Sequence, residues 1–175
     1  SDPRGVISSP ENMANLYRNA GDTATALTYF RLAAQNAKST NPVRYHRLLG
    51  DICLLVNQFD SAIHYYMASH QYVTLVTTDS VIRQRDLSYK TLFIGEIHMK
   101  QHKYDLAIEE LKPALQFFEK GNERNGMMRV LKLLAGCYQM KQNFARSFLY
   151  SKRLVEIAQA GGARPFIRDA YELYW

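Results

Sequence analysis

Apolar residues recur along this chain at steps of three and four, the spacing that places them on one face of an α-helix. Ile108, Leu111, Leu115 and Phe118 follow one another at these steps, with Leu106 just before them. No stretch alternates strictly enough between apolar and polar residues to indicate a strand. The pattern predicts an all-α protein whose helices span residues 10–20, 23–38, 43–56, 59–76, 83–100, 104–120, 125–141 and 144–160.

Helix start signals and short turns arrange these helices in pairs. Ser9-Pro10 and Asn41-Pro42 each supply a side-chain oxygen for a helix N-terminus, followed by a proline whose missing N–H costs nothing in the first turn. Short polar turns such as Asn57-Gln58 join the two members of a pair, and turns of that length make neighbouring helices antiparallel. Asn125-Gly126 precedes a helical run and is interpreted as a helix start instead of a hairpin turn.

Small residues mark the same place in every helical pair. Ala14, Gly50, Gly95 and Ala135 each precede a second small residue by 12 positions, and they follow one another at intervals of 36, 45 and 40 residues. Such periods predict a solenoid of repeated hairpins. We expect an N-terminal tail at 1–8 and one repeat domain over 9–175, with repeats at about 9–40, 41–80, 81–122 and 123–162 and a partial fifth at 163–175. A large residue at Gly50, Gly95 or Ala107 should overpack its helix contact and cost about 1–3 kcal/mol.

Composition narrows the function less than the repeats do. The 175 residues carry a net charge of +6, which is moderate and can simply favour solubility. Such a charge can also attract acidic peptides or nucleic acid, and we favour the peptide over nucleic acid. The longest apolar stretches fall well short of the roughly 18–20 residues that cross a bilayer, so no membrane span is predicted. Cys53 and Cys137 stand alone in helical patterns and are expected to be buried free thiols. The compartment is left open: the cytoplasm is slightly favoured, and the periplasm would suit a membrane-bound sensor.

Candidate catalytic chemistry is sparse. His98 and His102 are four residues apart on one predicted helix, a spacing that can hold a metal ion, but no glutamate follows His98 in the HExxH manner. Gly161-Gly162 lacks the lysine and hydroxyl of a phosphate-binding loop, and no strand is predicted on which a nucleophile could sit. We therefore expect a non-enzymatic protein with no metal site and no cofactor.

The hairpins resemble tetratricopeptide repeats (TPRs), in an extended variety of about 40 residues found in bacterial signalling proteins and regulators. The second repeat carries Leu49-Gly50, Phe59, Ala62 and Tyr66, and the third carries Ile94-Gly95, Tyr104, Ala107, Leu111 and Ala114. The first carries Tyr17, Gly21, Ala26, Phe30 and Ala33, and the fourth carries Leu134-Ala135, Tyr138, Phe144, Ser147 and Leu154. The resemblance implies an α-α superhelix whose first helices line a concave, protein-binding face.

Carried over by position, the resemblance implies a set of partner-binding residues on that face. They are Asn15, Arg18, Asn19, Arg44, Arg47, Asp51, Tyr89, Glu96, Lys100, Arg129, Lys132 and Gln139. Arg44, Arg47, Arg129 and Lys132 are basic, so an acidic peptide or a C-terminal carboxylate is the expected ligand class. The carboxylate-clamp subtype does not fit: Glu11 stands where its lysine would be and Leu48 where its second asparagine would be, so that only Asn15 matches.

Two further expectations concern context. The array could be the sensory or regulatory region of a larger bacterial signal-transduction or transcription-regulator protein, and the sequence beyond Trp175 would discriminate this from a stand-alone interaction module. The partial fifth repeat leaves Tyr171, Leu173, Tyr174 and Trp175 without a second helix. Because exposed apolar ends of solenoids seek cover, self-association through that end is also expected.

Overall fold

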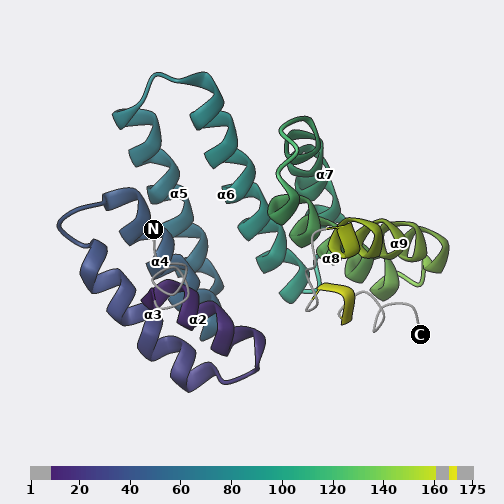
Figure 1. Cartoon of the computed structure of the whole chain (residues 1–175), viewed down its shortest axis with the longest axis horizontal. Helices are drawn as coiled ribbons and strands as arrows, with labels where there is room; N and C mark the ends of the chain where they lie inside the picture. The colour runs from purple at the N-terminus through teal and green to yellow at the C-terminus, as the bar shows by residue number, and fades with distance from the viewer. Residues whose placement is uncertain (1–8, 161–165, 169–175) are drawn as a thin grey trace. The chain divides into compact units, whose positions relative to one another are not determined.

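The computed structural model describes residues 9–160 and 166–168, and within them the chain is all-α (Figure 1). The helices are α2 (Pro10–Asn19), α3 (Thr23–Ala37), α4 (Pro42–Leu55), α5 (Phe59–Val76), α6 (Ser80–Lys100), α7 (Tyr104–Lys120), α8 (Arg124–Met140) and α9 (Phe144–Ala160). These bounds confirm the predicted helices to within three residues. The predicted tail at 1–8 and most of the partial fifth repeat, including the residues expected to self-associate, lie outside the described residues.

Successive helices pack as hairpins, α2 on α3, α4 on α5, α6 on α7 and α8 on α9. The chain divides into two compact units, residues 1–78 and residues 79–175. In the first unit α3 also packs on α4, so that the two hairpins share a core; in the second unit α8 packs on both α6 and α7. Each unit is therefore a pair of hairpins built in the same way, an all-α helical repeat. Within the described residues, no helix is long and apolar enough to cross a membrane.

Side-chain oxygens define several helix N-termini. Ser9 and Asn41 each accept a hydrogen bond from the backbone N–H three residues ahead, at 3.2 and 2.9 Å, as predicted. Asp79 was not predicted as a cap, yet its Oδ1 accepts from two backbone N–H groups at 2.8 and 3.1 Å. For this reason α6 begins at Ser80, three residues before the predicted start at 83.

The turn inside each hairpin has the same backbone geometry. Gly21, Asn57, His102 and Gln142, each seven residues after a repeat marker, have φ values of 82°, 58°, 61° and 58°. Each donates its N–H to the backbone oxygen three residues earlier, at 2.8–3.2 Å, and the next N–H donates to the oxygen five residues earlier, at 2.8–3.0 Å. This is a Schellman motif, which closes a helix with one left-handed residue. The repeat seen in the small residues is thus also present in the turns.

Small residues allow the helices of a hairpin to approach closely, as predicted. A Cβ atom on Gly50 would lie 2.5 Å from the Tyr66 ring, and one on Gly95 would lie 2.8 Å from Leu111 Cγ. Ala107 is fully buried. Gly126 was not predicted as a contact, but a Cβ atom there would lie 2.5 Å from the Phe118 ring. The core therefore depends on these positions having little or no side chain.

Polar atoms in the core are mostly paired. The hydroxyls of Ser69 and Ser147 donate to backbone oxygens of the facing helix at 2.9 and 3.0 Å. Cys53 and Cys137 are buried free thiols, as expected. Burial raises the pKa of Cys137 to about 11, so its thiol stays protonated and unreactive at neutral pH.

Candidate functional site

The predicted binding residues all lie on the first helices of the hairpins, α2 and α4 in the first unit and α6 and α8 in the second. Asn19, Lys100 and Lys132 are exposed, and eight others are partly buried. Asp51 departs from the prediction because it is 3% exposed, so its carboxylate is not on the surface.

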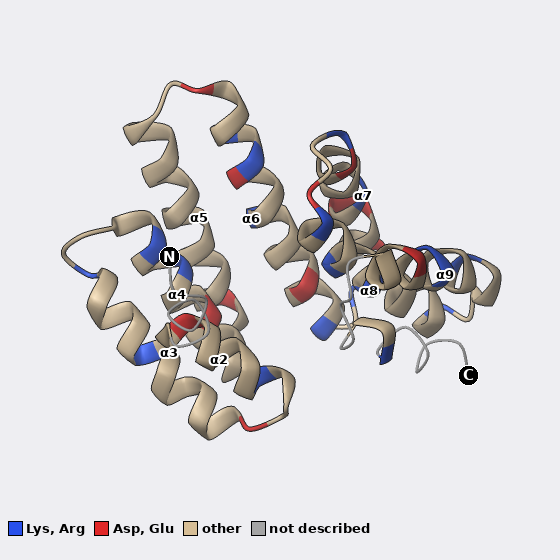
Figure 2. Cartoon of the chain, viewed as in Figure 1, with Lys and Arg blue, Asp and Glu red and all other residues tan. Residues whose placement is uncertain are grey.

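Glu11 of α2 forms ion pairs with two arginines of α4, Arg44 and Arg47. Figure 2 colours the acidic and basic positions of these helices. Glu11 Oε2 lies 2.9 Å from Arg44 Nε and Glu11 Oε1 lies 2.5 Å from Arg47 Nη2. Burial alone would raise the pKa of Glu11, but the charge and hydrogen bonds of Arg47, followed by those of Arg44, outweigh burial and hold that pKa below its ordinary value. Glu11 is therefore an ionised carboxylate with both oxygens bonded. We call Arg44 and Arg47 the arginine fork.

Asp51 holds Arg47 from the opposite side. Arg47 Nη1 lies 3.0 Å from Asp51 Oδ2, and the Tyr66 hydroxyl on α5 donates to Asp51 Oδ1 at 2.9 Å. Burial would lower the pKa of Arg47, yet the charges of Asp51 and Glu11 raise it overall. The arginine fork, predicted to face an acidic ligand, is thus satisfied by two carboxylates of the same chain.

The other predicted residues of the first unit lie farther along α2. Asn15 Nδ2 donates to the backbone oxygen of Glu11 at 2.9 Å, so its amide supports the helix. The Arg18 guanidinium lies 5.8 Å from the centroid of the Phe30 ring, within the range of a cation–π contact. Asn19 is the last residue of α2 and is exposed. These residues offer a polar edge but no concentrated charge.

Arg129 on α8 has different surroundings in the second unit. Its Cζ lies 4.9 Å from the centroid of the Phe93 ring, which is only 5% exposed. Its Nη2 lies 3.6 Å from Glu96 Oε2, beyond ordinary hydrogen-bond distance, and this is its closest carboxylate among the described residues. The guanidinium is therefore within cation–π range of the ring, while most of its N–H donors lack a carboxylate within the described chain.

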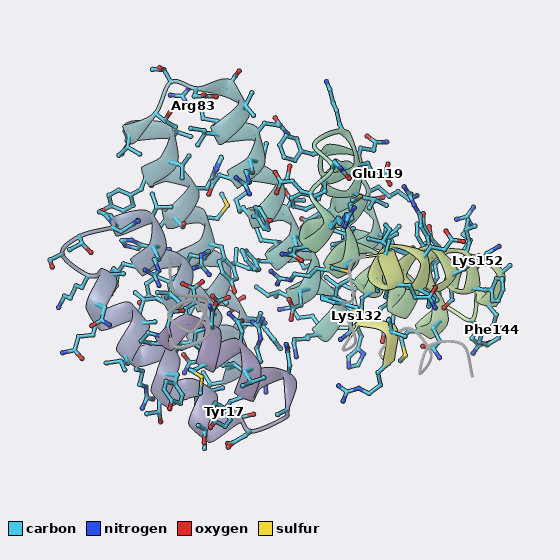
Figure 3. All side chains as sticks on the ribbon, viewed as in Figure 1. Tyr17, Arg83, Glu119, Lys132, Phe144 and Lys152 are labelled. Atoms are coloured by element: carbon cyan, nitrogen blue, oxygen red, sulfur yellow. The ribbon has the colours of Figure 1, made fainter. Side chains whose placement is uncertain are left out.

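Lys132 lies three residues after Arg129 on α8 and is exposed (Figure 3). Residues three apart share one side of a helix, so α8 presents two cations together. Lys100, at the end of α6, is exposed, and Gln139, near the end of α8, is partly buried. We define the α6–α8 face as Glu96 and Lys100 of α6 with Arg129 and Lys132 of α8. Its formal charge is three positive against one negative, whereas the arginine fork is balanced by Glu11 and Asp51.

Tyr89 belongs to the packing between α6 and the start of α8. Its hydroxyl donates to Glu123 Oε2 at 3.2 Å, its ring lies 4.9 Å from that of Phe118, and Arg85 Nε approaches Glu123 Oε1 at 3.0 Å. Burial, followed by the charge of Glu123, raises the pKa of Tyr89. Tyr89 is therefore a tethered, partly buried ring, and its role as a partner contact stays a prediction.

Sequence reasoning missed three residues that organise these surfaces: Glu11 as the partner of the fork, Phe93 beneath Arg129, and Glu123 beside Tyr89. The spacing of Phe93 and Glu96, three apart on one helix, is a signal that could have pointed to a shared environment. Glu11 and Glu123 meet arginines more than 30 residues away in the sequence, and no local spacing indicates such pairs.

Two other features lie outside this face. His98 Nδ1 lies 3.7 Å from Glu110 Oε1, while His102 Nδ1 pairs with the Tyr104 hydroxyl at 2.7 Å, so the two histidines have different partners. Among the described residues no group of three or more metal-ligating side chains is brought together. Between α7 and α9 there is a hollow of about 400 Å³, lined by Lys112, Leu115, Gln116, Glu119, Leu149, Tyr150 and Arg153, which contains none of the predicted residues.

Comparison with known proteins bears on the fold. No protein-family model matches the chain, and no curated protein sequence matches it. The fold is that of an all-α helical repeat. Among solved structures, it is similar to the crystal structure of BtubC (BKLC) from P. vanneervenii. The similarity covers 97% of this chain and 72% of that chain, with a TM-score of 0.60 and 16% sequence identity. At that identity the similarity establishes the fold alone.

Proposed function

We propose that this chain is a non-enzymatic, TPR-type interaction module that binds an acidic segment of a partner protein on the α6–α8 face. One observation carries the proposal: the Arg129 guanidinium carbon lies over the Phe93 ring at 4.9 Å from its centroid, and its one approach to a described carboxylate is 3.6 Å, to Glu96. An arginine positioned by a buried ring in this way is pre-organised for a two-point hydrogen bond to an incoming carboxylate. The partner is therefore expected to bring aspartate, glutamate or a C-terminal carboxylate.

The charge around Arg129 supports an acidic partner over a basic one. Lys132 and Lys100 are exposed near the polar side of the same two helices, and Glu96 is the one carboxylate of the face. A peptide carboxylate that meets Arg129 would replace the loose contact to Glu96, and a second acidic residue would gain from Lys132. Because these groups are exposed or half-exposed, the affinity should fall as salt is added.

Loss of the two cations of α8 tests the proposal. The double variant Arg129→Ala/Lys132→Ala should bind a fluorescent peptide of alternating glutamate and leucine on the order of tenfold more weakly than the unmodified chain, since it loses charge-assisted hydrogen bonds. A matched control, Lys112→Ala/Lys120→Ala, removes two exposed cations from α7 of the same unit.

Fluorescence anisotropy at low and high salt measures both affinities. The proposal predicts that the control retains most of the binding and that the salt dependence is smaller in the α8 variant. Equal weakening by both pairs would show non-specific attraction to a basic chain. An affinity that neither double variant changes would mean that the peptide binds elsewhere on the chain. Either result would contradict binding at the α6–α8 face.

A further inference from the structure

We propose that Glu11 occupies the arginine fork as an internal ligand, and that the fork is a latent carboxylate-binding site which the chain itself keeps closed. The inference deepens the proposed function and rests on it for its biological meaning, because it decides which of two basic pairs an acidic partner can reach. Its chemistry can be tested separately, with a small dicarboxylate as the probe.

The contacts of Glu11 are those that a bound carboxylate would make. Its two oxygens are shared between Arg44 Nε at 2.9 Å and Arg47 Nη2 at 2.5 Å, a short and charge-assisted pair of bonds. The side chains of Arg44 and Arg47 are 42% and 27% exposed, and that of Glu11 is 21% exposed. The fork thus reaches solvent, and a small anion could enter from outside if Glu11 did not fill it.

Arg47 does not depend on Glu11 for its position, whereas Arg44 contacts Glu11 alone among the described carboxylates. Arg47 is held independently by Asp51 on its own helix at 3.0 Å, and Asp51 is fixed by the Tyr66 hydroxyl at 2.9 Å. Asp51 and Tyr66 are both buried, 3% and 1% exposed. Removing the Glu11 charge would therefore leave a pre-organised guanidinium with one edge bonded to Asp51 and the other edge open. With Arg44 beside it, the emptied site carries one net positive charge.

An outside carboxylate competes poorly while Glu11 is ionised. Glu11 is attached to the same unit and needs no association step, so its effective concentration is in the millimolar range or above. A partner peptide at micromolar concentration would not displace it. We therefore expect acidic ligands not to bind at the fork, although α4 carries two cations at the predicted positions, Arg44 and Arg47, as α8 does.

Substitution of Glu11 tests the inference. The variant Glu11→Gln keeps the size of the side chain and removes its charge, and succinate is the probe. We expect Glu11→Gln to bind succinate on the order of tenfold more tightly than the unmodified chain, measured by NMR of the arginine Nε–Hε signals. The double variant Glu11→Gln/Arg47→Gln should lose that gain. Glu109→Gln removes an exposed carboxylate from α7 and serves as the matched control, with no gain expected.

The outcomes separate this inference from the proposed function. If Glu11→Gln binds succinate no better than the control, or if its gain survives loss of Arg47, the fork is a purely structural ion-pair network and the inference is wrong. If Glu11→Gln does not fold, the unmodified chain is titrated with succinate instead. A shift of the Arg44 or Arg47 signal at low millimolar succinate would contradict a closed fork, and unshifted signals would support it. If the proposed function is wrong, the result is instead a peptide affinity that does not change when Arg129 and Lys132 are replaced.

Discussion

Replacing Gly50 with alanine tests the packing that holds a hairpin together. An added Cβ atom would lie 2.5, 2.7 and 2.9 Å from three atoms of the Tyr66 ring. The ring is 1% exposed, and its hydroxyl is bonded to Asp51 at 2.9 Å. Tyr66 therefore cannot move away from α4 without straining that hydrogen bond, which in turn supports Arg47.

The expected loss follows from three opposing effects. Alanine in place of glycine favours the helix by about 1 kcal/mol. Overpacking against a fixed ring costs about 1–3 kcal/mol, and weakening a hydrogen bond to a charged carboxylate costs about 1.5–3 kcal/mol. The net effect of Gly50→Ala should be a loss of about 1.5–5 kcal/mol in the free energy of unfolding of the first unit.

Gly136 provides a matched comparison. It is also a buried helical glycine, but a Cβ atom there would meet the terminal Cε of Met99 at 2.7 Å. A methionine end can change rotamer at small cost, so Gly136→Ala should change stability by no more than about 1 kcal/mol in either direction.

Urea denaturation followed by far-UV circular dichroism measures both variants. Because the chain has two compact units, the curves should be fitted for two transitions where the data require them. Equal losses for the two glycines, or a neutral Gly50→Ala, would refute the reasoning that a rigid, hydrogen-bonded ring is what makes Gly50 necessary.

Three smaller predictions concern single positions. Gln142→Gly should stabilise the second unit by up to about 1 kcal/mol, because Gln142 has a φ of 58° that glycine adopts without strain. Gly21→Ala should destabilise the first unit by a similar amount, because Gly21 has a φ of 82°. Urea denaturation measures both changes. Ser151→Ala should raise the free energy of unfolding by about 1 kcal/mol, because the Ser151 hydroxyl is buried with no hydrogen-bond partner among the described residues; a lower melting temperature would contradict this. Since the pKa of Glu11 is lowered on folding from an ordinary 4.5, its contribution is present above that pH and is lost as the pH falls through the folded-state value. The stability difference between the unmodified chain and Glu11→Gln should therefore shrink in acid, and a difference that is constant with pH would argue against an ionised Glu11.

The sequence predicts the helices well because their signals are local. Apolar periodicity, cap residues and polar turns act over a few positions, and α9 was predicted at 144–160 and is found there. The start of α6 was misplaced because Asp79 was not recognised as a cap in a stretch with no proline to mark it. Small residues identified the hairpin contacts, although the role of Gly126 depends on Phe118 of the preceding helix.

The surface chemistry could be predicted only in part. Position on a first helix correctly separated Arg129 and Lys132 from the core, but it could not distinguish them from Arg47. That difference depends on contacts 36 residues apart in the sequence, Glu11 with Arg47 in one unit and Phe93 with Arg129 in the other. Asp51 is predicted on the concave face from its position in the repeat; Arg47 and Tyr66 compensate its charge and allow it to be buried.

The most direct test of the account is the location at which an acidic peptide binds. NMR of the isotope-labelled chain, titrated with the glutamate–leucine peptide, reports binding residue by residue. The account predicts chemical-shift changes centred on α6 and α8 around Arg129 and Lys132, with the arginine fork of α4 unchanged. Changes centred on α2 and α4, or no localised change at saturating peptide, would contradict it.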